Sequence, residues 1–132
     1  MILCPPTYGM YGVSADIHNV EVIEVPLNDN FELQIDRILS HSATCIFVCS
    51  PNNPSGNSLH GIEQLLDSFE GIVVVDEAYI DFSSSRSVTE LLPGYPNLIV
   101  MQTFSKAWAL ASARVGIAYA SREIIALMDK TK

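Results

Sequence analysis

The chain has 132 residues, of which 48% are hydrophobic and 17% charged, and its 7 basic and 15 acidic residues give a formal net charge of −8. This length and composition exclude a disordered chain and allow one domain with a hydrophobic core. The few, scattered basic residues argue against nucleic-acid binding, and no apolar run is long enough to span a membrane.

In the first half of the chain, apolar runs alternate with amphipathic segments. Residues 20–25 predict a strand, and residues 31–39 predict a short helix because their apolar positions recur at helical spacing. A second strand is expected at 45–49. It is followed by a loop at 50–58, rich in proline, asparagine and glycine, and by an amphipathic helix at 59–69.

The second half continues the alternation. Ser87-Val88-Thr89-Glu90 is a capping-box pattern, so a short helix is expected between Ser87 and the turn at Pro93-Gly94. The other elements expected in this half are strands at 72–75, 98–101 and 115–120, a loop and helix over 106–113, and a final helix that Ser121 caps and that runs to the C-terminus.

The predicted strands are continuous apolar runs rather than alternating ones. Such runs are typical of strands buried on both faces, so we expect a three-layer α/β/α fold with a mostly parallel sheet. The predicted helices are few for so many buried strands, and the sequence ends within a helical pattern. We therefore expect residues 1–132 to form a single partial domain, whose uncovered sheet faces need a partner.

The cysteines and histidines show no metal-ligand spacing. Cys45 and Cys49 fall in a predicted strand and are interpreted as small buried side chains, and the three histidines are dispersed, so no metal site is expected. Three cysteines without a disulfide framework indicate a reducing compartment, and the first residues have no signal-peptide pattern. These features predict a cytoplasmic protein.

Polar clusters follow three of the predicted strands, at the point where each strand ends. They occupy residues 50–57, 76–79 and 103–106. Because ligands of open parallel sheets bind at the carboxyl ends of the strands, we expect the three clusters to converge on one ligand.

Lys106 is the most informative of these polar residues. A lysine near the end of an apolar strand is costly unless chemistry requires it, and a neutral amine can form a Schiff base with the aldehyde of pyridoxal 5'-phosphate. We expect an apolar setting near Arg114, since desolvation and positive charge both favour the neutral amine. Asp76 could pair with the protonated ring nitrogen. Alternatively, Lys106 begins a helix and extends to water, and Asp76 is a cap or turn residue.

The remaining candidates match the other parts of the same cofactor. Asn53 and Tyr79 can donate to the ring oxygen, and Tyr8 can stack on the ring. A bidentate cation and neighbouring hydroxyl groups suit a phosphate. The phosphate candidates are Arg114, Ser105 and Thr103. Taken singly, each residue has an ordinary structural explanation, such as a turn residue, a core aromatic or a surface charge, but the joint pattern is far more specific.

A different function class is suggested by residues 72–78, which imitate the Walker B strand of ATPases. That motif alone is common by chance. The sequence contains no Gly-x-x-x-x-Gly-Lys-[Ser/Thr] phosphate loop, so the ATPase interpretation lacks its main part.

Across essentially all 132 residues, the sequence resembles the central part of histidinol-phosphate aminotransferases, fold type I pyridoxal-phosphate enzymes of the aspartate aminotransferase superfamily. The resemblance rests on four segments in order: Pro6-Thr7-Tyr8-Gly9-Met10-Tyr11, Cys49-Ser50-Pro51-Asn52-Asn53-Pro54-Ser55-Gly56, Val75-Asp76-Glu77-Ala78-Tyr79-Ile80-Asp81-Phe82, and Thr103-Phe104-Ser105-Lys106-Ala107-Trp108 through Arg114-Val115-Gly116. Departures are mild: Ser55 stands where threonine is common, and Ala109 and Ser112 where glycine is common.

The resemblance implies a transaminase of histidine biosynthesis that uses pyridoxal phosphate and works as a homodimer. It makes Lys106 the Schiff-base lysine and proton shuttle, with Asp76 on the pyridine nitrogen. It assigns Tyr79 and Asn53 to the ring oxygen, Tyr8 to ring stacking, and Ser105, Arg114 and Thr103 to the phosphate.

The resemblance also implies parts that are not in this sequence, namely an N-terminal segment and a C-terminal small domain that completes the substrate site. We therefore expect residues 1–132 to be the central part of the cofactor-binding large domain, with weak or absent transamination in isolation. Alternatives are another enzyme of the superfamily, either an aromatic aminotransferase or a phosphothreonine decarboxylase, and a non-catalytic interaction module.

Overall fold

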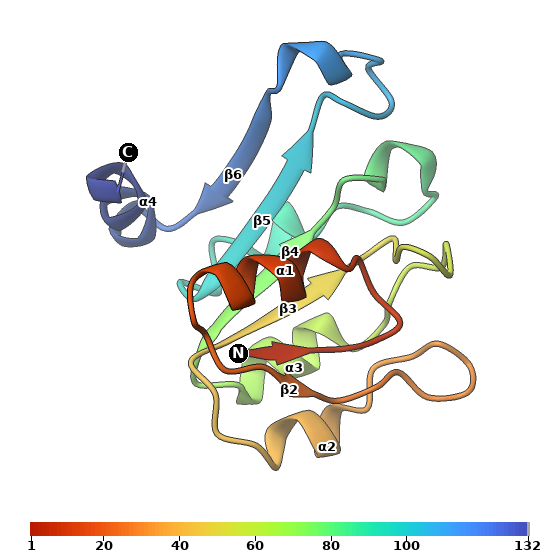
Figure 1. Cartoon of the computed structure of the whole chain (residues 1–132), viewed down its shortest axis with the longest axis vertical. Helices are drawn as coiled ribbons and strands as arrows, with labels where there is room; N and C mark the ends of the chain where they lie inside the picture. Colours follow the sequence, from red (N-terminus) through yellow and green to blue (C-terminus); the bar gives the residue numbers. More distant parts are fainter. Residues whose placement is uncertain (132) are drawn as a thin grey trace.

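The computed structural model describes residues 1–131, in which one six-stranded sheet organises the chain (Figure 1). The strand order is β2-β1-β3-β4-β5-β6. The pairs from β2 to β5 are parallel, whereas β6 runs antiparallel to β5. The strands are β1 (Ile2–Leu3), β2 (Ile23–Glu24), β3 (Cys45–Cys49), β4 (Ile72–Asp76), β5 (Leu98–Thr103) and β6 (Gly116–Ala120). The predicted mostly parallel α/β sheet is confirmed.

The helices lie on both sides of this sheet. They are α1 (Met10–Ile17), α2 (Ile35–Leu39), α3 (Ile62–Ser68) and α4 (Arg122–Met128), with short 3-10 turns η1 (Ile80–Phe82), η2 (Val88–Leu91), η3 (Ala111–Ala113) and η4 (Asp129–Thr131). The final helix begins as predicted, because the Ser121 hydroxyl accepts a hydrogen bond from the backbone N–H of Ile124 at 3.4 Å. Within residues 1–131, no helix has the length and apolar character that crossing a bilayer requires.

Two predicted helices are shorter than their apolar patterns suggested. Phe31 has a left-handed backbone (φ 56°), and the Asn28 side chain accepts from the N–H groups of Asn30 and Glu32, so a loop replaces the first turn before α2. Gly61 is also left-handed (φ 83°) and directly precedes α3, which sets the start of that helix. The strand predicted at 20–25 shrinks to two of its residues, Ile23–Glu24, which form β2.

The sequence patterns missed β1 and α1. β1 has only two residues, and α1 mixes small, polar and apolar residues without a side-chain cap at Gly9. Tyr11 and Ala15 are nevertheless buried on one side of α1. The helix therefore depends on its packing against the sheet rather than on its own sequence pattern.

The prediction that Glu90 is the acidic member of a capping box with Ser87 is wrong. Ser87 does cap the following turn, with its hydroxyl accepting from the N–H of Thr89 at 3.1 Å. Glu90 is exposed and pairs with Arg86 at 3.5 Å. The buried carboxylate of Glu77 accepts instead from the Ser87 hydroxyl and the Val88 N–H, at 2.6 and 2.7 Å. Glu77, which directly follows β4, therefore supplies the acidic acceptor at the start of this element, and the element is a 3-10 turn.

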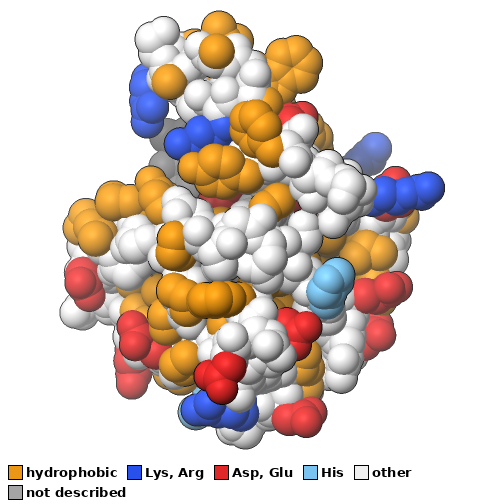
Figure 2. Space-filling view, turned by 90° about the vertical axis from the view of Figure 1, so that its right-hand side faces the viewer, with side chains coloured by type: hydrophobic (Ala, Val, Ile, Leu, Met, Phe, Trp, Pro, Cys, Tyr) orange, Lys and Arg blue, Asp and Glu red, His pale blue; other side chains and the backbone are white. Residues whose placement is uncertain are grey.

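The core divides into two parts, one on each face of the sheet. Ile46 and Val48 join the larger cluster, together with the apolar side chains of α2 and α3. Phe47 and Cys49 point to the other face, where they pack with Leu3 and with Tyr11 of α1. Cys4, Cys45 and Cys49 are all free thiols. The surface carries apolar side chains among polar ones, with several acidic groups on the lower part of the view (Figure 2).

Candidate functional site

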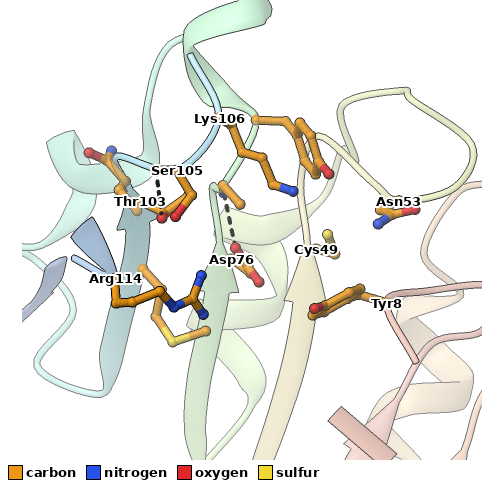
Figure 3. A pocket seen from close by; sticks show the side chains of 12 residues that line it. Tyr8, Cys49, Asn53, Asp76, Thr103, Ser105, Lys106 and Arg114 are labelled. Carbon is orange, nitrogen blue, oxygen red and sulfur yellow. Dashed lines mark hydrogen bonds between the residues drawn. The ribbon is translucent and has the colours of Figure 1, made fainter. Parts of the chain in front are cut away.

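A pocket of about 310 Å³ opens where β3, β4 and β5 end, at the carboxyl edge of the sheet (Figure 3). The three polar clusters that the sequence placed after these strands do meet there. All eight predicted site residues line this pocket: Tyr8, Asn53, Asp76, Tyr79, Thr103, Ser105, Lys106 and Arg114. The other lining residues are Cys49, Ala78, Met101 and Gln102.

Asp76 ends β4 and contributes a carboxylate to the pocket. Its Oδ1 accepts from the backbone N–H of Ala78 at 2.9 Å. Its Oδ2 accepts from the hydroxyl of Tyr11 at 2.6 Å, a short bond of the kind that a charged acceptor forms. Each carboxylate oxygen can accept more than one hydrogen bond, so both keep capacity for a ligand donor.

Tyr11 is the residue of this site that the sequence patterns missed. It is only 6% exposed, and it lies in α1, 65 positions from Asp76. Burial and the negative charge of Asp76 both raise the pKa of its phenol above the ordinary value. The only indication in the sequence was that Tyr11 belongs to the same short motif as Tyr8, at residues 6–11. No local sequence pattern linked Tyr11 to Asp76.

Cys49 was interpreted as a structural residue, and the structure places it at the pocket wall as well. Its thiol donates to the carbonyl of Pro51 at 3.4 Å. Burial raises the pKa of the thiol, so the uncharged form persists. Cys49 therefore adds a small apolar surface next to Asp76.

Lys106 faces the same cavity as Asp76, from the loop between β5 and η3 (Figure 3). Its Nζ lies 5.3 Å from the centre of the Tyr79 ring, within the range of a cation–π contact. The apolar setting expected for this lysine is wrong, because the side chain is exposed. The cause is that β5 ends at Thr103, so the chain has left the sheet before Lys106.

The hydroxyl and guanidinium groups predicted for a phosphate line one side of the pocket (Figure 3). The Thr103 hydroxyl accepts from the Ser105 N–H at 3.1 Å and donates to the Val115 carbonyl at 3.3 Å. Arg114 donates to the Ala111 carbonyl at 3.3 Å and has a left-handed backbone (φ 52°). Residues 106–113, where a loop and a helix were expected, form a loop followed by the 3-10 turn η3, and β6 begins at Gly116, after this turn.

Asn53 and Tyr8 approach from two other loops. The buried Asn52 side chain donates to the carbonyl of Pro6 at 3.0 Å and to the Ser55 hydroxyl at 2.6 Å, which ties the two loops together. The Tyr8 ring meets the Tyr11 ring edge to face, with centroids 5.5 Å apart. Tyr8 is 44% exposed, so one side of its ring is available to a ligand.

This arrangement suits a small aromatic ligand that carries a phosphate. An amine and a carboxylate face one cavity, aromatic rings stand beside it, and an arginine with two hydroxyl groups lies on one side. The volume falls at the small end of known ligand pockets. Among residues 1–131, no cluster of three or more potential metal ligands occurs.

Comparisons with known proteins identify the family of this chain. The whole chain, residues 1–132, matches the family described as aminotransferase class I and II. It is 51% identical to a histidinol-phosphate aminotransferase of Cytophaga hutchinsonii and 53% identical to one of Christiangramia forsetii, in each case over the entire chain. The chain spans 39% of the length of these curated relatives.

The fold is shared with solved structures. The histidinol-phosphate aminotransferase of Clostridium acetobutylicum superimposes with a TM-score of 0.91, covering 99% of this chain and 42% of that one at 24% identity. At this identity the likeness concerns the fold. The expected fold type I architecture is thereby confirmed.

Proposed function

The chain belongs to the class I and II aminotransferase family, and on this basis we propose that its pocket binds pyridoxal 5'-phosphate for transamination. The proposed reaction moves an amino group from histidinol phosphate to 2-oxoglutarate. The donor carbon exchanges its amino group and a hydrogen for a carbonyl oxygen, and the acceptor undergoes the reverse change. The observation that supports this most strongly is that all eight predicted residues line one cavity.

The donor set of the pocket fits this cofactor. Asp76 would hold the ring nitrogen, since its oxygens keep acceptor capacity beside Tyr11 and Ala78. Asn53 and Tyr79 would donate to the ring oxygen, and Tyr8 would cover the ring. The phosphate side would consist of Thr103, Ser105 and Arg114.

Lys106 would carry the proton chemistry. The cofactor, when bound, supplies an aldehyde that reacts with amines and a ring that withdraws electrons from the neighbouring carbon. The Nζ of Lys106 would then accept a proton at one carbon and deliver it at the next. Its position on the loop after β5 allows this movement, since the side chain is exposed and lies over the Tyr79 ring.

The same proposal covers the domain organisation, the cellular location and the oligomeric state of the whole protein. Residues 1–132 would form the central part of a cofactor-binding large domain, in agreement with the 39% of the relatives' length that they span. The protein would work in the cytoplasm as a homodimer.

Reductive trapping tests the proposed function. The purified protein is mixed with pyridoxal phosphate, reduced with borohydride, digested and mapped by mass spectrometry. We expect the cofactor mass on Lys106, loss of this product in Lys106→Ala, and an unchanged product in Lys130→Ala, a lysine of η4. Trapping on other lysines, or on none in folded protein, would contradict the proposal. A transamination assay on the whole protein, with histidinol phosphate and with aromatic amino acids as donors, then distinguishes the substrates, since weak or absent activity is expected of residues 1–132 alone.

A further inference from the structure

We propose that Tyr11 is a positioning residue that acts on the cofactor through Asp76, an inference that rests on the proposed function. The two side chains come from different elements, α1 and β4, and meet on the same face of the sheet. Their hydrogen bond of 2.6 Å is the shortest polar contact made by the Asp76 side chain among the described residues. The phenol would fix the carboxylate in the orientation that the ring nitrogen requires.

The surroundings of Tyr11 keep its hydroxyl in place. Its ring packs against Phe47 at a centroid distance of 5.2 Å and against Tyr8 at 5.5 Å. Leu3 and Cys49 complete the buried cluster around it. A side chain held on several sides loses little further freedom when it donates, so the hydrogen bond can be maintained without ligand.

The chemistry of the phenol also favours a constant donor. Burial and the adjacent Asp76 raise its pKa, so the hydroxyl keeps its proton over the range in which enzymes work. With Tyr11 on Oδ2 and the Ala78 N–H on Oδ1, the carboxylate is held at both oxygens. Such double support fixes the plane of the carboxyl group, which no single hydrogen bond would do.

A purely structural role for Tyr11 is the competing explanation, because buried tyrosines commonly satisfy their hydroxyl on a nearby acceptor. The two explanations differ in what Asp76 contributes. If Tyr11 only fills space, its hydroxyl should matter equally whether residue 76 is charged or not. If Tyr11 positions the carboxylate, its hydroxyl should matter only when that carboxylate is present.

A double-mutant cycle of Tyr11→Phe and Asp76→Asn distinguishes the positioning role from the structural role. The quantity measured is the dissociation constant of pyridoxal phosphate, by absorbance titration. We expect Tyr11→Phe to raise this constant about tenfold, since hydrogen bonds to charged groups are the stronger class. In an Asp76→Asn background the same substitution should change it less than twofold. The visible absorption band of the bound cofactor should also shift in Tyr11→Phe.

The chain offers a matched control in Tyr95→Phe. The Tyr95 hydroxyl donates to Asp67 at 2.7 Å, a second tyrosine–aspartate pair, and neither residue lines the pocket. Loss of the Tyr95 hydroxyl should leave the affinity for pyridoxal phosphate unchanged. Tyr11→His, which keeps a ring donor, should recover part of the affinity lost in Tyr11→Phe, and thermal unfolding of each variant verifies its fold.

The outcomes distinguish this inference from the proposed function. If the parent protein binds no pyridoxal phosphate, the proposed function itself fails. If the parent binds the cofactor but Tyr11→Phe binds within twofold of it, or loses equal affinity in both backgrounds, Tyr11 is structural and the inference is overturned. A Tyr11→His variant as poor as Tyr11→Phe would also count against it.

Discussion

Asp76 and Glu77 are adjacent in the chain, yet their carboxylates serve opposite faces of the sheet. Asp76 lines the pocket on the α1 side, whereas Glu77 is 2% exposed and accepts from Ser87, Val88 and Gln102. Successive side chains at the end of a strand point in opposite directions, which explains the division. Glu77 is therefore not available as the second acidic group of an ATPase site, and family membership makes that interpretation unnecessary.

The first prediction concerns the structural role of Glu77. Glu77→Ala leaves a half-buried backbone N–H and two side chains without their acceptor, so the free energy of unfolding should fall by roughly 2–4 kcal/mol. Urea denaturation provides the measurement. Glu90→Ala is the control, because its pair with Arg86 is exposed and contributes only about 0–1 kcal/mol. If Glu90→Ala lowered the free energy of unfolding more than Glu77→Ala, the result would instead support Glu90 as the acidic member of the capping box.

The second prediction concerns the phosphate side of the pocket. Arg114→Ala should raise the dissociation constant of pyridoxal phosphate by roughly 10- to 100-fold, since a charge-assisted bond to phosphate is lost. The same variant should bind pyridoxal, which has no phosphate, as the parent does. Absorbance titrations with both compounds measure the difference. Arg37→Ala, in α2, should change neither value, and equal losses for both compounds would contradict a phosphate role.

The third prediction concerns thiol reactivity. Burial raises the pKa of Cys4 from 9.0 to about 12, so its thiolate at pH 8 is roughly 1000-fold scarcer than that of an ordinary thiol. The half-exposed Cys45 should therefore react with iodoacetamide first, and mass spectrometry of timed samples gives the order. In urea all three cysteines should react.

The raised pKa of Cys4 also predicts how the stability of the folded protein changes at alkaline pH. The folded-state pKa of Cys4 lies above the unfolded value, so the folded state retains its proton more strongly. This contribution to stability is complete below about pH 9 and is lost as the pH rises toward 12. Rapid modification of Cys4 in folded protein at pH 8 would show that the thiol is accessible, against this expectation.

The sequence by itself determined the strand-forming runs and the residues that share the pocket. Apolar runs such as 45–49 and 72–75 became β3 and β4 almost unchanged, because buried parallel strands need continuous apolar side chains. The sequence also predicted correctly that the polar clusters after these strands lie together. Carboxyl ends of parallel neighbours lie at one edge of a sheet, so position along the chain predicts position in space.

Only the tertiary structure decided how these pieces meet. The antiparallel direction of β6, the contact of Tyr11 with Asp76 and the use of Glu77 in place of Glu90 all join segments whose pairing leaves no local pattern. The exposure of Lys106 likewise follows from where β5 ends rather than from its apolar neighbours. Local patterns report the burial of each segment, whereas hydrogen-bond partners distant in sequence depend on the packing of the whole sheet.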